Sequence, residues 1–238
     1  SMDEDYDDKI VIQPGYRTII AFQIATAMAY LHSLGVIHRD LCSSNVTIDS
    51  EFTARVTNFA NSRFLPEDFL TMSFKPKSSS EFKAPEINSP DGYNETIDVF
   101  SFAGILYELL TGKPPFKGMK PLYIEKMITK AERPNLPPET SDDLRNLIEL
   151  CWSQDWKKRP SFAEIIDMML SKTITFPSDS QSEITQQFYS ALKIQNVDFK
   201  ACFDLFKQIT KAISNSFVYS HEAFRIRTYI YTYLFLLE

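Results

Sequence analysis

The chain has 238 residues, a formal net charge of −6 and a hydrophobic content of 44%. It is long enough to bury a sizeable core, and its composition is ordinary for a soluble globular protein. The acidic balance argues against nucleic-acid binding by bulk electrostatics, and the three scattered cysteines argue against a disulfide framework or a metal site. With no signal peptide and no apolar run long enough to span a membrane, we expect a cytoplasmic protein.

The first part of the chain predicts one long helix and two short strands. Residues 1–15 contain an acidic run and are expected to form a solvated leader. Apolar side chains recur at helical spacing over 16–34, and Gly35 ends this predicted helix. Strands are predicted at 46–49 and 55–59, on either side of a polar turn.

The middle of the chain is predicted to be mainly helical. Residues 61–83 show no periodicity and are expected to form a long loop, which in a compact domain tends to be functional. The stretch 96–111 is apolar on all sides and predicts a helix at the centre of a domain. Ser161 and Glu164 have the spacing of a capping box. Further helices are predicted at 120–131, 141–153 and 161–172.

The last part of the chain is expected to be a separate helical extension. A Pro-Ser-Asp-Ser-Gln-Ser stretch from Pro177 indicates a boundary, and two or three aromatic-rich helices are expected after it. The favoured interpretation is an accessory segment that covers part of the preceding domain. A partner-binding helix is the alternative, although aromatic residues at helical spacing more often belong to a core.

Several short motifs follow one another in a characteristic order. The block at 36–45 reads Val-Ile-His-Arg-Asp-Leu-Cys-Ser-Ser-Asn and has the spacing H-R-D-L-x-x-x-N of a kinase catalytic loop. Ala-Pro-Glu at 84–86, Asp-Val-Phe-Ser-Phe-Ala at 98–103 and Cys-Trp-x-x-Asp-x-x-x-Arg-Pro at 151–160 follow it. Each motif alone is weak evidence, but the ordered set resembles the protein kinases. The loop ending and the last motif are similar to the tyrosine-kinase-like group of serine/threonine kinases.

The resemblance covers about 16–170 and implies a mainly α (α+β) fold. Residues 16–174 would form only the large, C-terminal lobe of a protein kinase, with short β-strands near the catalytic loop. Residues 175–238 would be the helical C-terminal extension.

The same resemblance implies roles for individual residues. Asp40 stands at the position of the catalytic base, and Asn45 stands where the second magnesium ion is held. Arg39 would pair with a phosphorylated activation loop, because a guanidinium binds phosphate in bidentate fashion. A phosphorylation site or a substrate-facing hydroxyl would lie among three serines, for which a solvated loop is an equally good interpretation. These are Ser78, Ser79 and Ser80.

Other residues that match the family have structural roles. Glu86 and Arg159 would form a buried ion pair that fixes the activation segment, and leaving either partner unpaired could cost about 3–5 kcal/mol. Asp98 would brace the catalytic loop from beneath. His38 and Phe59 are expected to pack in the core.

Three departures from the family pattern concern the handling of nucleotide. Asn58 replaces the aspartate that binds magnesium, and an amide lacks the negative charge that this ion prefers. Cys42 stands where this group usually has a lysine, so no positive charge faces the phosphate. Thr47 replaces an apolar residue under the adenine. Ala60 and Ala103 also replace two glycines, which removes backbone freedom.

The remaining parts of a kinase have no counterpart in this sequence. None of the six glycines belongs to a G-x-G-x-x-G arrangement, and no Val-Ala-Ile-Lys motif precedes the catalytic loop. We therefore expect no cofactor for this chain alone, although magnesium and ATP are the cofactors of the family. We also expect protein partners rather than nucleic acid or membrane.

Three hypotheses remain open on the sequence. The chain is a catalytically impaired, pseudokinase-like module that acts in signalling through binding or scaffolding. Alternatively, it is a serine/threonine kinase that transfers the ATP γ-phosphate to protein hydroxyls when a longer parent chain supplies the small lobe. The third hypothesis is a fragment with no function of its own.

Overall fold

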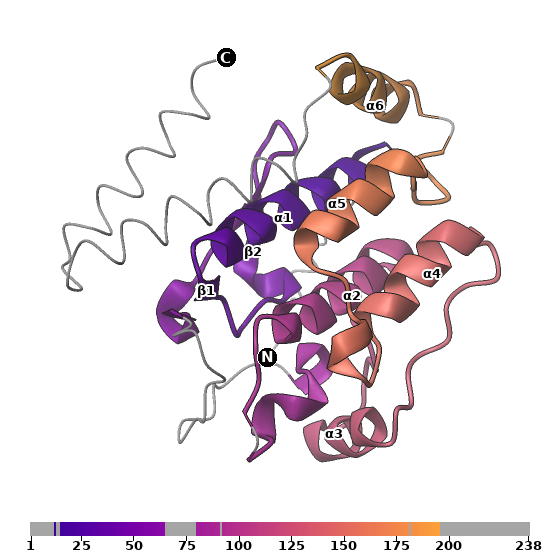
Figure 1. The fold of residues 1–238 in the computed structure, drawn as a ribbon. Helices are drawn as coiled ribbons and strands as arrows, with labels where there is room; N and C mark the ends of the chain where they lie inside the picture. Colours follow the sequence, from indigo (N-terminus) through magenta and orange to yellow (C-terminus); the bar gives the residue numbers. More distant parts are fainter. Residues whose placement is uncertain (1–11, 13–14, 65–79, 91, 181, 196–238) are drawn as a thin grey trace, which may run out of the picture.

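The computed structural model describes residues 12, 15–64, 80–90, 92–180 and 182–195, and all structural statements concern these residues. The described part of the chain is mostly helical, which confirms the predicted fold class (Figure 1). Its α-helices are α1 (Tyr16–Ser33), α2 (Thr96–Thr111), α3 (Pro121–Thr129), α4 (Asp142–Cys151), α5 (Phe162–Ser171) and α6 (Glu183–Gln195). Its strands are β1 (Val36–Ile37), β2 (Val46–Ile48), β3 (Ala54–Val56) and β4 (Arg63–Phe64).

Helix α2 lies at the centre of the helical body. Every residue from Ile97 to Leu106 is buried, as the apolar stretch predicted. Helices α1 and α4 pack against α2, and α5 packs along α1 (Figure 1). Gly104 of α2 permits the close approach of Phe82, because a Cβ atom at 104 would lie 2.6 Å from Cδ1 of Phe82. The predicted central helix is therefore confirmed.

The ends of the predicted helices are set by local hydrogen bonds. The capping box predicted for α5 is present, with Ser161 and Glu164 each accepting a hydrogen bond from the backbone of the other. The Ser141 side chain accepts a hydrogen bond from the backbone of Leu144 at the start of α4. Gly112 ends α2 in the left-handed conformation, with φ of 68°.

The strands form two small antiparallel sheets. Strands β2 and β3 pair as Val46 with Val56 and Ile48 with Ala54, close to the predicted positions. The strand predicted to run as far as residue 59 ends earlier, because Asn58 adopts a left-handed conformation with φ of 63°. Strands β1 and β4 also pair, which the sequence pattern did not indicate. Together, β1 and β2 hold the two ends of the segment 38–45.

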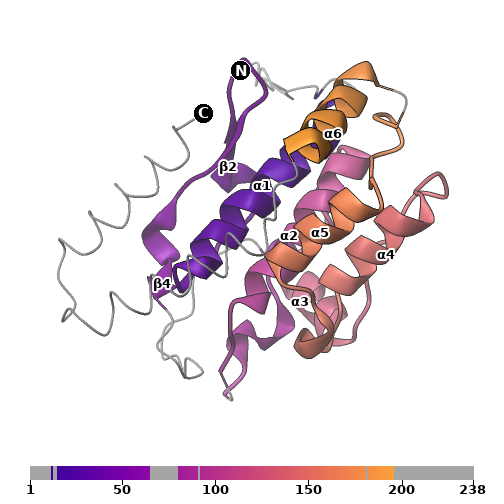
Figure 2. The ribbon, with the colours of Figure 1, turned by 45° about the horizontal axis from the view of Figure 1, so that its top comes forward.

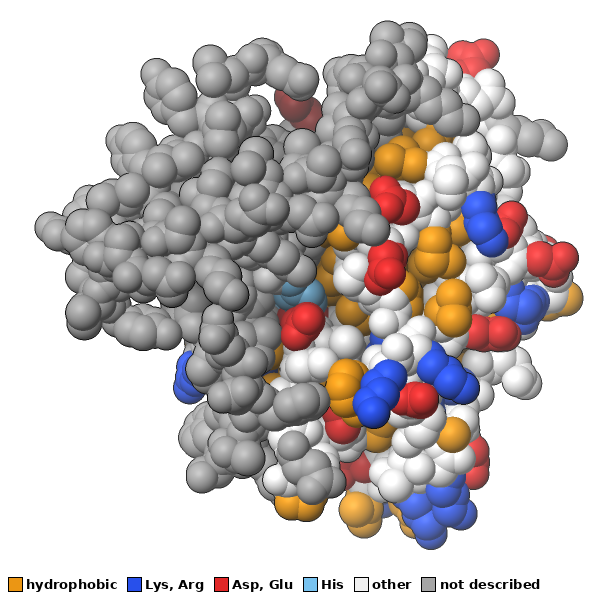
Figure 3. Space-filling model, viewed as in Figure 1, with side chains coloured by type: hydrophobic (Ala, Val, Ile, Leu, Met, Phe, Trp, Pro, Cys, Tyr) orange, Lys and Arg blue, Asp and Glu red, His pale blue; other side chains and the backbone are white. Residues whose placement is uncertain are grey.

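The surface in Figure 3 mixes charged and apolar side chains on the face that it shows. Among the described residues, no helix is both long enough and apolar enough to cross a membrane.

A residue from far along the chain caps the first turn of α1. The Asp179 carboxylate accepts hydrogen bonds from the backbone N–H groups of Gly15 and Thr18, each at 2.7 Å. Asp179 is fully buried. A carboxylate is favourable at this position because the first turn of a helix presents unpaired N–H groups and a partial positive charge. The segment after α5 therefore completes a helix near the start of the chain.

Further polar contacts fix the same segment to α1. The backbone N–H of Phe176 donates to the Thr18 hydroxyl at 3.1 Å, and the Thr185 hydroxyl donates to the carbonyl of Gly15 at 2.9 Å. Tyr189 in α6 is buried on the same side. Figure 2 shows α6 beside α1. These contacts cross the boundary expected near residue 175 and join the first described residues of the extension to the helical body.

Replacing Asp179 by alanine should destabilise the protein by about 1–3 kcal/mol, because two buried N–H groups lose their acceptor. Asp179→Asn keeps one acceptor oxygen and should have an intermediate effect. Urea unfolding of the whole chain measures both, with Ser180→Ala at the exposed neighbouring position as the control. A free energy of unfolding for Asp179→Ala equal to that of the control would show that the cap is not stabilising.

Candidate functional site

The buried carboxylate of Asp98 holds the segment that carries Asp40. Its Oδ2 accepts a hydrogen bond from the backbone N–H of His38 at 2.8 Å, and its Oδ1 accepts one from the backbone N–H of Arg39 at 2.9 Å. Nε2 of His32 lies 3.0 Å from the same Oδ2. Arg39 has φ of 69°, a conformation that is uncommon for residues other than glycine. Asp98 therefore stabilises the tight backbone turn that directly precedes Asp40.

His38 is fully buried beneath this turn. Its Nδ1 accepts a hydrogen bond from the backbone N–H of Asp40 at 3.3 Å, so Nε2 carries the proton and donates to the carbonyl of Thr57 at 2.9 Å. The Phe59 ring packs edge-on against His38, with centroids 5.2 Å apart, but remains 47% exposed. The prediction that Phe59 lies in the core is therefore wrong, because it follows the left-handed turn at 58 and only one side of its ring is covered.

Asp40 is buried and paired on two sides. Its carboxylate Oδ2 accepts a hydrogen bond from Nδ2 of Asn61 at 3.1 Å, and its backbone carbonyl accepts one from Nδ2 of Asn45 at 2.7 Å. The carbonyl of Asn61 in turn accepts a hydrogen bond from the Arg39 guanidinium at 3.1 Å. Sequence reasoning missed Asn61, because only the 3₁₀ turn η2 (Phe59–Asn61) brings it to Asp40.

The two positions that would hold magnesium are paired with each other. Nδ2 of Asn58 donates a hydrogen bond to Oδ1 of Asn45 at 3.0 Å. Because Nδ2 of Asn45 already donates to the carbonyl of Asp40, both ends of the Asn45 amide are occupied. Asn58 thus bonds to Asn45, and Asn45 and Asn61 each bond to Asp40; we call these three side-chain amides the amide network.

Cys42 and Thr47 bring no charge to this site. Cys42 is buried, with its Sγ 3.1 Å from Oγ of Ser44. Burial raises the pKa of the Cys42 thiol, so it stays neutral near pH 7. Thr47 is exposed on β2, and its hydroxyl lies 3.5 Å from the carbonyl of Arg55. The site therefore has a neutral thiol where the resemblance to the tyrosine-kinase-like group predicts a lysine.

The Arg39 side chain is turned into the protein. Its guanidinium donates to the carbonyl of Asn61 at 3.1 Å and lies 5.7 Å from the centre of the Tyr93 ring. It is buried in this position. The pairing of Arg39 with a phosphorylated loop stays a prediction.

The serines predicted near the activation loop are only partly described. Ser78 and Ser79 lie outside the described residues. Ser80 begins the 3₁₀ turn η3 (Ser80–Phe82) and is partly buried.

Glu86 and Arg159 form a bidentate ion pair between distant segments. The Arg159 guanidinium donates to both carboxylate oxygens of Glu86, which lies in the 3₁₀ turn η4 (Pro85–Asn88). Arg159 also donates to the carbonyls of Thr96 and Ser153, at 3.1 and 2.9 Å. Each nitrogen of this guanidinium thus has an acceptor, as a buried arginine requires.

The Phe100 ring lies close to two guanidinium groups. Arg159, which follows the 3₁₀ turn η5 (Trp156–Lys158), and Arg133 both lie 4.9 Å from the ring centroid. Arg133 donates to the carbonyl of Trp152 at 3.1 Å. Burial and the neighbouring Arg159 lower the pKa of Arg133 to about 10, which still leaves it charged near pH 7. The aromatic ring of α2 therefore connects the ion pair to the segment before α4.

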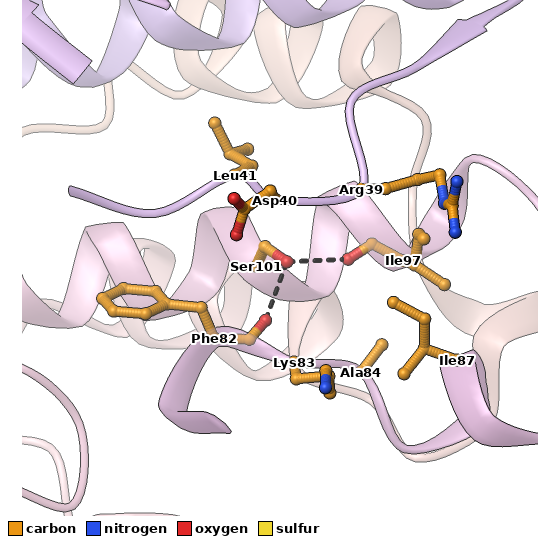
Figure 4. A pocket seen from close by; sticks show the side chains of 9 residues that line it. All are labelled: Arg39, Asp40, Leu41, Phe82, Lys83, Ala84, Ile87, Ile97 and Ser101. Carbon is orange, nitrogen blue, oxygen red and sulfur yellow. Dashed lines mark hydrogen bonds between the residues drawn. The ribbon is translucent and has the colours of Figure 1, made fainter. Parts of the chain in front are cut away.

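A small hollow lies between the segment of Asp40, η3 and α2 (Figure 4). The Asp40 carboxylate faces Ser101 in this view, whereas the Arg39 side chain points elsewhere. The Ser101 hydroxyl lies 2.7 Å from the carbonyl of Phe82 and 3.1 Å from that of Ile97. It thereby connects α2 to η3 at the hollow. The hollow is lined by Arg39, Asp40, Leu41, Phe82, Lys83, Ala84, Ile87, Ile97 and Ser101.

The helical body, and the turn that it braces beneath Asp40, define a protein-kinase-like domain. Residues 9–169 match the protein tyrosine and serine/threonine kinase family, and the chain belongs to this family. A probable LIM domain-containing serine/threonine-protein kinase of Dictyostelium discoideum is 40% identical over 159 residues, which are 66% of this chain and 16% of that protein. The serine/threonine-protein kinase STY17 of Arabidopsis thaliana is 36% identical over 151 residues, 63% of this chain and 26% of that protein. The chain thus spans only a small part of these relatives.

The residues of the site do not fit the magnesium ion of the family. Magnesium binds carboxylate, phosphate and water oxygens, whereas Oδ1 of Asn45 accepts a hydrogen bond from the amide of Asn58. Among the described residues, no group of three His, Cys, Asp or Glu side chains is arranged to hold a metal ion. The amide network instead links the segment that carries Asp40 and Asn45 to the turn at Asn58 by direct hydrogen bonds.

The Glu86–Arg159 pair should contribute far more to stability than an exposed ion pair. Arg159→Met leaves the Glu86 carboxylate without its partner and should lower the free energy of unfolding by about 3–5 kcal/mol. Lys172→Met removes the exposed pair with Asp143 and should have almost no effect. Urea unfolding compares the two variants, and equal losses would contradict the role of the buried pair.

Proposed function

We propose that this chain is a catalytically impaired kinase-like module of the tyrosine-kinase-like group, which acts by binding or scaffolding other proteins. The single observation that carries the proposal is the hydrogen bond from Asn58 to Asn45. It uses an amide donor where the family needs an oxygen ligand for magnesium.

The charges around Asp40 support the proposal. Phosphoryl transfer depends on positioning and on neutralising the charge of the transferring group. Asn58 supplies no negative charge for a metal, and the thiol of Cys42 is neutral. The Asp40 carboxylate itself accepts a hydrogen bond from Nδ2 of Asn61 at 3.1 Å, so one of its oxygens already has a partner.

The interactions that hold the fold are kept in full. Asp98 still accepts hydrogen bonds from the backbone of the catalytic loop, and Glu86 still pairs with Arg159. A protein that acts by binding needs its folded surface and not its phosphoryl-transfer groups. A binding module would therefore retain the interactions that hold its fold and lose the groups that serve phosphoryl transfer. Because the chain has a net charge of −6, we propose protein partners in the cytoplasm, in signalling, rather than nucleic acid or membrane.

A second candidate function is a serine/threonine kinase that acts within a longer chain. Two observations favour it: Asp40 and Asn45 are both in place, and the relatives named above are serine/threonine kinases of which this chain spans only a part. ATP and magnesium would be its cofactors, and protein hydroxyls would be its substrates. Phosphate transfer by the full-length protein, lost in Asp40→Asn, would establish this function.

The variant Asn58→Asp tests the amide network directly. A carboxylate at 58 cannot donate to Oδ1 of Asn45 and repels it, so the melting temperature should fall by roughly 2–6 °C without magnesium. Added magnesium should restore part of this loss, because two facing oxygens can share a cation. The unchanged protein should melt at the same temperature with or without magnesium and ATP.

Asn94→Asp is the matched control for this experiment. The side-chain oxygen of Asn94 only accepts hydrogen bonds at the start of α2, so the aspartate keeps them and should show no response to magnesium. Stabilisation of the unchanged protein by ATP only when magnesium is present would contradict the proposed function. A ligand at a hundred times its dissociation constant adds about 2.7 kcal/mol, which such a melt detects.

A further inference from the structure

Exposed apolar side chains are concentrated at the start of α3. Met119, Leu122 and Tyr123 are 40%, 76% and 59% exposed, and they account for three of the five large exposed hydrophobic residues in the described chain. The opposite face of α3 is anchored in the core by Ile124 and Ile128. The exposed residues are therefore not needed for folding α3 onto the protein.

Lysines surround these apolar side chains. Five lysines and two glutamates lie within 113–132, although the whole chain has a net charge of −6. Figure 3 shows blue and orange side chains together at the lower end of the molecule, where Figure 1 places α3. We call Met119, Leu122, Tyr123 and the exposed lysines around them the α3 surface. These lysines are Lys113, Lys117, Lys120, Lys126 and Lys130.

The backbone that presents the α3 surface is held in one conformation. Phe116 is buried below it, and its carbonyl accepts a hydrogen bond from the backbone N–H of Met119 at 3.0 Å. The Thr111 hydroxyl donates to the carbonyl of Lys113 at 3.0 Å, at the end of α2. Pro114 and Pro115 restrict the chain between these two points. Binding here would lose little conformational entropy.

We propose that the α3 surface binds an acidic segment of a partner protein that places an apolar side chain against Leu122 and Tyr123. The inference rests on the proposed binding function, and it adds the surface and the chemistry of the partner. Tyrosine in a central apolar position commonly dominates binding energy, and a rim of lysines steers and orients an acidic partner.

The composition of the surface favours a protein over a membrane. An interfacial helix needs a broad apolar face with which to enter the lipid. Helix α3 has Ile124 and Ile128 in the protein core, and only two of its large apolar side chains, Leu122 and Tyr123, are exposed.

Helix α3 also packs against η3 and η4, which carry Phe82 and Glu86. A partner on the α3 surface would therefore contact a helix that packs against η3, whose Phe82 lines the hollow near Asp40 (Figure 4). The amide network itself is not part of the surface, so the two can be altered separately.

The test uses the whole chain and three fluorescent peptides in an anisotropy titration. One peptide combines Glu and Asp with Leu and Phe, the second has the same acidic residues with Ser in place of Leu and Phe, and the third has Lys in place of the acidic residues. The first should bind, more weakly as salt is raised. Its affinity should fall at least about tenfold in Leu122→Ser/Tyr123→Ser and in Lys117→Glu/Lys120→Glu.

Ile184→Ser is the matched control, because Ile184 is an exposed apolar residue of α6, outside the α3 surface. It should leave peptide affinity unchanged. Urea unfolding checks that the variants are folded, which is expected because the changed side chains are exposed. No binding of the first peptide, or an equal loss in the control, would overturn the proposal.

Further measurements distinguish two other ligands of the α3 surface, a membrane and a second copy of the chain, from the proposed acidic segment. Binding to vesicles of anionic phospholipid without binding to the peptide would assign the surface to a membrane and overturn the proposal. Self-association in sedimentation velocity that Leu122→Ser abolishes would assign it to a second copy and also overturn it. Failure of the peptide test leaves the melting behaviour of Asn58→Asp unchanged, so it can be distinguished from failure of the proposed function.

Discussion

The buried carboxylate of Asp98 is the interaction on which the site depends. It lies in the central helix and accepts hydrogen bonds from the backbone of His38 and Arg39, where the chain makes a left-handed turn. A fully buried carboxylate is stable only when its oxygens are paired, and the turn is stable only when its N–H groups have acceptors. Each therefore stabilises the other, and together they fix the direction of Asp40.

Around this fixed point, side-chain amides make direct hydrogen bonds. Asn45, Asn58 and Asn61 connect the catalytic loop to the turn after β3 without a carboxylate at the metal position. Direct hydrogen bonds between neutral groups satisfy one another and need no ion. The site keeps the Asp40 carboxylate and has neutral side chains at Cys42 and Asn58. The activity that we propose for the exposed α3 surface is binding of a partner protein, which does not use this site.

Much of the fold could be predicted because its signals are local. The helix over 96–111 was evident from its apolar composition, and the capping box of Ser161 and Glu164 from its spacing. Phe59 was misplaced because its exposure depends on the left-handed turn at Asn58, which the residue types before it do not indicate. Asp179 was read as part of a domain boundary, because its partner backbone lies more than 160 residues away.

The sequence by itself determined the family resemblance, the order of the helices and the identity of the altered residues, because these depend on residue type and spacing along the chain. Only the tertiary structure decided how those residues pair. The Asn58–Asn45 hydrogen bond, the contact of Asn61 with Asp40 and the cap on α1 join segments that are far apart in sequence or turned by local backbone geometry. Such contacts depend on distance and direction in space, which hydrophobic periodicity and residue spacing do not encode.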